Sequence, residues 1–296
     1  MFFFWKNVVL AQHEFSIYGG GGISTLNYST TVGKQNNSTG YNFGFNYGYQ
    51  PVTSNWSALT GIGFSMHNSS FNLNISDFYT NTYVYDIDEE VDFLFSSYLN
   101  GHKEDQNKIF LNVPFMAKYV FDMKKSSLSK HFFYTAGGVK VGIPLGGRYH
   151  IKIDNIRNTG YYEKEDYEYT TQTFRGFGTF NNKTFNGRLD FDVALFLSFE
   201  VGMKFLTTKT YIHHTERLTI YTGLFLDYGL NNIHKTKGTH SIIEYNTVDQ
   251  QNFIMNSVLN SQYMPDKSFT SIVKPIAAGI KITLSLEKIP SHTTFY

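Results

Sequence analysis

The chain contains no cysteine, which excludes a disulfide framework, thiolate catalysis and thiolate metal sites. Charged residues are also scarce at 17%, the formal net charge is only +1, and no basic stripe is interleaved with aromatic residues. Nucleic acid is therefore not an expected partner. No run of about 18 apolar residues is present, so a transmembrane helix is excluded and only a closed barrel could carry this chain across a membrane.

Aromatic residues and glycine are abundant instead, with 22 Tyr, 28 Phe and 25 Gly. This composition favours long β-strands with aromatic ends over helices. The segment from Asp190 to Phe205 alternates between apolar side chains and polar or small ones, and this period of two predicts a strand. The segment is longer than an ordinary soluble strand of about 5 to 6 residues, and about 9 to 11 tilted residues already cross a bilayer.

The same alternation, with the turn residues between the runs, predicts eight strands, and the connections alternate between short and long. Bacterial outer-membrane barrels have tight periplasmic turns and extended extracellular loops in this order. The sequence therefore predicts an all-β fold, an eight-stranded antiparallel up-and-down transmembrane β-barrel, as one domain over residues 13–290. The strands are expected at 14–26, 40–50, 56–66, 107–121, 131–144, 190–206, 217–230 and 272–287. The short turns are 51–55, 122–130 and 207–216, and the long loops are 27–39, 67–106, 145–189 and 231–271.

Residues 1–12 precede this domain and have two interpretations. Two short apolar stretches fall within them, and Val9 and Ala11 are small enough for the positions that a signal peptidase requires. Lys6 is the single basic residue there. The segment is either the remnant of a secretory signal or a periplasmic tail.

The two faces of the predicted strands differ in size. One face holds glycine and asparagine, as at Asn42, Gly44 and Gly63, whereas the other holds large apolar residues such as Phe43 and Phe45. The interior of an eight-stranded barrel is only wide enough for side chains to fill it. We therefore expect the small face to line the lumen and the large apolar face to meet lipid.

Four short pieces of the predicted strands carry a resemblance: residues 15–22 (FSIYGGGG), 111–119 (LNVPFMAKY), 133–140 (FYTAGGVK) and 227–232 (DYGLNN). Pro114 is the most specific element of the resemblance. Proline is rare in a central strand because it has no backbone N–H to donate to the neighbouring strand. These pieces resemble the outer-membrane β-barrel family of Bacteroidetes, which includes PorT-like and OmpA-like barrels. The resemblance implies a barrel in the bacterial outer membrane and no shared activity. PorT-like relatives would add a role in secretion. The four pieces belong to strands common to the whole family, so they do not single out that branch.

Ionisable residues of both signs, in near balance, fall on the face predicted to line the lumen. An unpaired buried charge costs several kcal/mol, so we expect these residues to pair across the interior and close it to ions. The alternative is a gate or path for a small solute formed by Glu200, Lys204 and Lys281. The predicted lumen network consists of Glu14, Lys118, Lys140, Glu200, Lys204, Arg217, Asp227, Lys281 and Glu287.

The third long loop contains tyrosines mixed with acidic residues, namely Tyr161, Tyr162, Tyr167 and Tyr169. Tyrosine supplies a large contact area at low entropic cost, so this segment suits the binding of an extracellular protein or glycan. The alternative is that the segment extends strands above the membrane and that its glutamates are merely solvated.

No residue pattern predicts a catalytic or metal site. His213, His214 and Glu216 resemble a metal cluster, but adjacent residues on a strand point to opposite faces. A rim hydrolase would need a nucleophile, a base and an acid in reach of one another, but no spacing joins the candidates Ser65, His67, Asp86, Asp88, Glu89, Asp190 and Asp192.

We therefore predict a non-enzymatic protein of the bacterial outer membrane without a metal or cofactor, with a filled polar lumen and surface loops in structural or ligand-binding roles. Its expected partner is outer-membrane lipid, and it is expected to be a monomer because closure leaves no free strand edge. A small-solute channel and a rim hydrolase acting on lipid or peptide are the alternatives.

Overall fold

The structure, a computed structural model, describes residues 11–30, 32–51, 54–73, 78–87, 89–121, 131–207, 216–234, 240–264 and 267–288. Residues 1–10 of the predicted signal or tail lie outside the described residues, as do the predicted turn 122–130 and residues 208–215. Residues 11 and 12 belong to the first strand. Among the described residues, no helix has the length and apolar character to cross a membrane.

Most of the described chain is antiparallel β-structure, which confirms the predicted all-β class. The main sheet has thirteen strands rather than the eight predicted. They are β1 (Ala11–Asn27), β2 (Gly33–Asn37), β3 (Thr39–Pro51), β4 (Trp56–Leu73), β5 (Phe78–Asp86), β6 (Val91–Asn100), β7 (Lys103–Phe121), β8 (His131–Tyr162), β9 (Tyr167–Tyr169), β10 (Gly178–Arg188), β11 (Ala194–Leu206), β12 (Glu216–Gly229) and β17 (Lys274–Lys288). The remaining elements are the 3₁₀-helix η1 (Thr173–Arg175) and two small hairpins, β13 (Ile243–Tyr245) with β14 (Phe253–Met255), and β15 (Gln262–Met264) with β16 (Lys267–Ser268).

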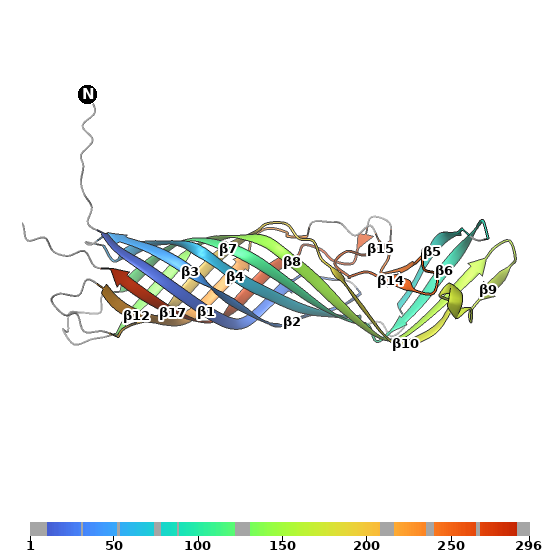
Figure 1. The fold of residues 1–296 in the computed structure, drawn as a ribbon, viewed down its shortest axis with the longest axis horizontal. Helices are drawn as coiled ribbons and strands as arrows, with labels where there is room; N and C mark the ends of the chain where they lie inside the picture. Colours follow the sequence, from blue (N-terminus) through green and yellow to red (C-terminus); the bar gives the residue numbers. More distant parts are fainter. Residues whose placement is uncertain are drawn as a thin grey trace, which may run out of the picture.

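Eight of the thirteen strands are the ones the alternation predicts, and we call them the ring strands: β1, β3, β4, β7, β8, β11, β12 and β17. They pair in the order β11-β12-β17-β1-β3-β4-β7-β8, and β8 also pairs with β11, so the path returns to its first strand (Figure 1). His13 lies opposite Lys288, so the first and last strands begin and end together. We call this end the terminal end and the opposite one the distal end.

The start of the predicted strand 190–206 is wrong. Strand β11 begins at Ala194, and Phe191 forms an isolated bridge with His234. Phe191 is only 4% exposed, although the alternation predicts an outward side chain. Next to this bridge, the Asp192 amide donates to the carbonyl of Ile233 at 2.8 Å instead of to a ladder partner.

The predicted loops 67–106 and 145–189 are largely strands. β4 continues to Leu73, β7 begins at Lys103, and β8 runs on to Tyr162, while β5, β6, β9 and β10 pair beyond the ring. These strands form a lobe that extends the molecule at the distal end (Figure 1). β8 is the spine of the lobe: one edge pairs with β7 and then β6, and the other with β11, β10 and β9 in turn.

The side chains of β8 reverse their facing at a bulge. Ile109 of β7 lies opposite Gly146 and Phe110 opposite Pro144, so Leu145 is an extra residue without a partner on β7. A one-residue slip moves every following side chain to the other face of a strand. The apolar residues at odd positions therefore point outward up to Leu145 and inward beyond it, where Tyr149, Ile151 and Ile153 are buried.

The inward residues beyond the bulge build an apolar core inside the distal lobe. Phe93 stacks on Tyr162 with ring centroids 4.9 Å apart, and Phe177 and Tyr245 pack edge-on against Phe93. The same core extends into the ring through residues such as Phe110 and Phe196. The lobe and the ring therefore share one continuous interior.

We expect Ile151→Ala to destabilise the distal lobe by about 2 to 5 kcal/mol, because it leaves a cavity in a packed core. His150→Ala changes the neighbouring residue, which points the other way, and serves as the control. Hydrogen exchange of the β8 and β10 amides measures both effects. A larger loss of protection in the His150 variant would contradict the reversed facing.

Candidate functional site

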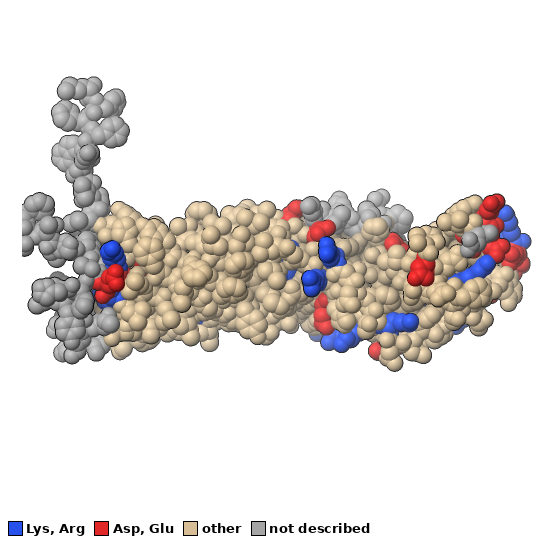
Figure 2. Space-filling view, viewed as in Figure 1, with Lys and Arg blue, Asp and Glu red and all other residues tan. Residues whose placement is uncertain are grey.

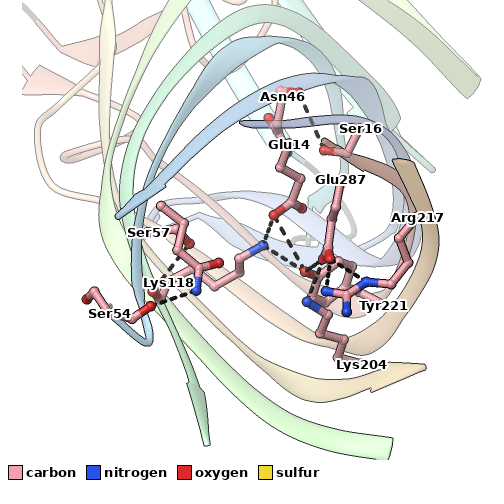
Figure 3. Close-up of polar contacts among 11 residues, drawn as sticks. Glu14, Ser16, Asn46, Ser54, Ser57, Lys118, Lys204, Arg217, Tyr221 and Glu287 are labelled. Atoms are coloured by element: carbon pink, nitrogen blue, oxygen red, sulfur yellow. Dashed lines mark hydrogen bonds and ion pairs between the residues drawn. The ribbon is translucent and has the colours of Figure 1, made fainter. Parts of the chain in front are cut away.

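The interior of the ring near its terminal end holds a cluster of charged side chains (Figure 3). These side chains come from five different strands, and the alternation of each strand points them inward. Lys118 Nζ lies 2.5 Å from Glu14 Oε2, and Lys204 Nζ lies 2.5 Å from Glu287 Oε1. The Arg217 guanidinium binds the other oxygen of Glu287, with Nε at 2.9 Å. Glu287 is thus shared by two bases and is fully buried.

Tyr221 joins the two carboxylates of this terminal cluster. Its hydroxyl donates to Glu287 Oε1 at 2.9 Å and accepts a hydrogen bond from Lys118 Nζ at 3.1 Å. The Lys118 ammonium also lies 4.3 Å from the centroid of the Tyr221 ring. The sequence analysis missed Tyr221, although its alternation places it on the same face as Arg217 and Asp227.

A second layer of ion pairs lies deeper in the ring. Lys140 Nζ contacts both carboxylate oxygens of Asp227, at 2.7 and 3.0 Å, and Lys281 pairs with Glu200. The Lys281 ammonium lies 4.1 Å from the centroid of the Tyr18 ring. All nine residues of the predicted lumen network therefore lie inside the ring, each in an ion pair.

The structure does not bring the three suggested gate residues into one group. Glu200 and Lys281 pair with each other in the deeper layer, whereas Lys204 pairs with Glu287 in the terminal cluster. Buried ions without partners are far more costly than paired ones, so this division leaves two self-contained charge layers.

Glycine makes room for the aromatic residues between these layers. A Cβ on Gly63 would lie 2.0 Å from the Tyr18 hydroxyl, so no larger residue fits there without moving the tyrosine. Phe43 and Phe45, on the opposite face of the same sheet, are exposed. The structure confirms the predicted facing, with small residues inside and large apolar residues outside.

A third layer surrounds His67. The Ser24 hydroxyl lies 2.9 Å from His67 Nδ1 and the Ser65 hydroxyl 3.2 Å from Nε2, while the His67 ring stacks on Phe196. The acids considered for a rim hydrolase lie elsewhere: Asp86 accepts a hydrogen bond from Tyr162 in the lobe, and Asp88 lies outside the described residues. The imidazole is therefore held by two hydroxyls in a packed interior.

The distal mouth of the ring is closed by the segment 240–262, which we call the cap. Glu104, on β7, accepts hydrogen bonds from the Ser257 hydroxyl and from the Val258 amide, the latter at 2.9 Å. Gln106 donates to the same carboxylate at 2.9 Å. Glu104 is completely buried and forms no ion pair with a described base.

Burial raises the pKa of Glu104 to about 7, and its three donors offset this only in part. The neighbouring ionisable groups are Asp105, Tyr28 and Tyr149, and none of them supplies a positive charge. The raised pKa means that the folded protein binds this proton more tightly than the unfolded chain. The contribution of Glu104 to stability is thus full below its ordinary pKa of about 4.3 and is lost as the pH rises through about 7.

We expect protection of the cap amides 257–259 against hydrogen exchange to fall between pH 5 and pH 8, after correction for the intrinsic rates. Glu104→Gln keeps a buried polar group without a titrating proton, so its cap should show nearly constant protection over this range. The same pH dependence in both proteins would contradict the role of Glu104.

The tyrosine-rich segment forms a hairpin at the tip of the lobe, with Tyr161 and Tyr162 at the end of β8 and Tyr167 and Tyr169 in β9. Its assignment as a binding surface needs one correction. Tyr162 is only 2% exposed, because it stacks on Phe93 and donates to Asp86 Oδ2 at 2.7 Å. It belongs to the core, whereas Tyr167 is exposed.

The histidine pair His213 and His214 lies outside the described residues. Within the described ranges, no group of three or more His, Asp or Glu side chains is arranged to hold a metal ion.

No protein-family model and no curated protein matches the chain. Among solved structures, the crystal structure of Neisserial surface protein A aligns with 95% of this chain and 99% of its own, at 7% identity and a TM-score of 0.33. A likeness at that level supports no conclusion about this chain, and the resemblance to the Bacteroidetes family stays a prediction.

Proposed function

We propose that the chain is a protein of the bacterial outer membrane in which the eight ring strands form a closed transmembrane β-barrel. The terminal end of the ring faces the periplasm, and the distal lobe stands outside the cell. Residues 13–290 form one domain, since the ring and the lobe share one core.

A belt of exposed apolar side chains without charges carries this proposal. Outward positions of all eight ring strands hold large apolar residues, among them Phe15, Phe45, Ile62, Phe115 and Leu197. Figure 2 shows a wide band free of Lys, Arg, Asp and Glu between charges at the terminal end and charges at the start of the lobe. Soluble monomers rarely expose apolar patches above a few hundred Å².

The height of the belt fits a bilayer. On β17 the outward apolar residues run from Ile276 to Leu286, between outward lysines at 274 and 288. About ten residues at about 3.3 Å each, tilted by about 40°, span about 25 Å, the height of the apolar band of outer-membrane barrels.

The filled interior supports a structural or ligand-binding role rather than transport. Two layers of ion pairs cross the lumen, and the cap occupies its distal mouth. We propose that the protein is non-enzymatic and monomeric, and that its lobe, including the exposed Tyr167, contacts an extracellular protein or glycan.

We expect Phe45→Arg to impair assembly, because arginine near the bilayer midplane costs about 2 to 4 kcal/mol. Tyr83→Arg is the matched control: Tyr83 lies in the lobe at 64% exposure, against 68% for Phe45. The free energies of unfolding of the two variants are compared by urea titration of the protein refolded into vesicles, with heat-modifiable mobility on gels as the readout. Equal stability of both variants, or a wild-type chain that stays monodisperse without detergent, would contradict the membrane setting.

We expect planar-bilayer recordings of the refolded protein to show no steady conductance, since every described charge of the lumen network is paired. A stable conductance that disappears in Glu200→Ala would instead support the small-solute channel.

A further inference from the structure

An amphipathic groove opens on the outer surface where β8 changes its partner. β8 pairs with β11 as far as Gly142 and with β10 only from Arg148 onward. Between these points its edge has one backbone bond among the described residues, from the Leu189 amide to the Gly147 carbonyl at 3.0 Å. The bulge at Leu145 lies in the same interval. The resulting groove has a volume of about 1090 Å³.

The groove crosses the boundary between the apolar belt and the polar surface. Its apolar wall includes Tyr41, Phe43, Phe64, Ile109 and Leu145. The next row of outward side chains toward the lobe is polar. It runs across four adjacent strands and consists of the register partners Asn68, Asn107, Arg148 and Arg188. A polar hollow of about 700 Å³, lined by groups such as Asp105, His150 and Asn186, shares Asn107 and both arginines with the groove.

Two arginines lie directly opposite each other in this first polar row. Arg148 and Arg188 are register partners on β8 and β10, both are exposed, and neither has an ion pair with a described acid. Like charges directly opposite on neighbouring strands destabilise a sheet. Such a pair is accommodated when an anion lies between the two guanidinium groups, and arginine matches the geometry of phosphate.

A buried base supports the same chemistry. Lys108 lines the groove at 1% exposure, and its ammonium lies 4.9 Å from the centroid of the Phe191 ring. It has no ion pair with a described acid, and Asp190 is the carboxylate that interacts with it electrostatically over a longer distance. Asp190 and Asp105 are the carboxylates in the two linings, against three bases. The surroundings of the arginine pair therefore favour an anion.

We propose that this groove binds an acylated, phosphorylated saccharide of the outer leaflet. Its acyl chains lie along Phe43, Phe64 and Ile109, its phosphate lies between Arg148 and Arg188, and its sugar occupies the polar hollow with His150 and Asn186. The site rests on the proposed membrane setting, because only there do the apolar belt and the first polar row mark the level at which lipid headgroups begin.

The test is a titration of the purified, folded protein in uncharged detergent with lipid A, an acylated diglucosamine bisphosphate, followed by native mass spectrometry. The double variant Arg148→Gln, Arg188→Gln should weaken saturable binding by about tenfold or more, because it removes the charge-assisted hydrogen bonds. The matched control is Lys103→Gln, Lys152→Gln. These lysines are also exposed register partners, two outward rows farther from the belt, and they line neither hollow.

Three outcomes would overturn the site. If both double variants lost the same amount of lipid A affinity, only a diffuse basic surface would be indicated. If phosphatidylglycerol bound as tightly as lipid A, the saccharide would not be part of what the site recognises. Displacement of lipid A by millimolar inorganic phosphate would indicate a site for the free anion. Heat-modifiable mobility of each variant confirms that the barrel is folded. A negative titration with a folded barrel therefore rejects the lipid site alone, whereas failure of the Phe45→Arg comparison rejects the membrane setting.

Discussion

The constraint on which the structure depends is that one set of strands must satisfy two different surroundings. In the proposed membrane setting, backbone groups of the belt would face hydrocarbon and have no water to bind, so each strand would need a partner on both edges; the β8–β11 pairing supplies the last of these pairs. In the lobe, water covers the outside and the apolar residues must turn inward. On β8 the bulge at Leu145 makes this change within one residue.

The width of the ring decides what its interior contains. Glycines such as Gly63 admit Tyr18, and the aromatic rings in turn lie against the ammonium groups of Lys281 and Lys118. The nine charges of the lumen network are stable in the interior because each has an opposite charge within contact distance, and Tyr221 links the pairs of the terminal cluster. The interior is therefore a packed polar core, and its side chains have few alternative positions.

Period-two alternation was enough to predict all eight ring strands and the inward side of all nine charges. The alternation failed to predict the direction of a side chain where that direction depends on more than local periodicity. The alternation of Tyr149, Ile151 and Ile153 continues that of Val139 and Ile143, so the sequence alone does not reveal the reversal at the bulge. The contact between Glu104 and Val258 joins residues far apart in the chain, and no local pattern predicts it. Tyr162 was misassigned for the same reason, because its partner Phe93 belongs to a different predicted loop.

The continuity of β8 has a mechanical consequence. The strand passes from the ring into the lobe as one element. Beyond the bulge it is paired with β7 and then β6 on one edge and with β10 on the other. The 17 residues of β8 beyond Leu145 correspond to about 55 Å of extended chain. Because β8 belongs to both parts, a force applied at the tip of the lobe is transmitted through this strand to the ring strands beside it.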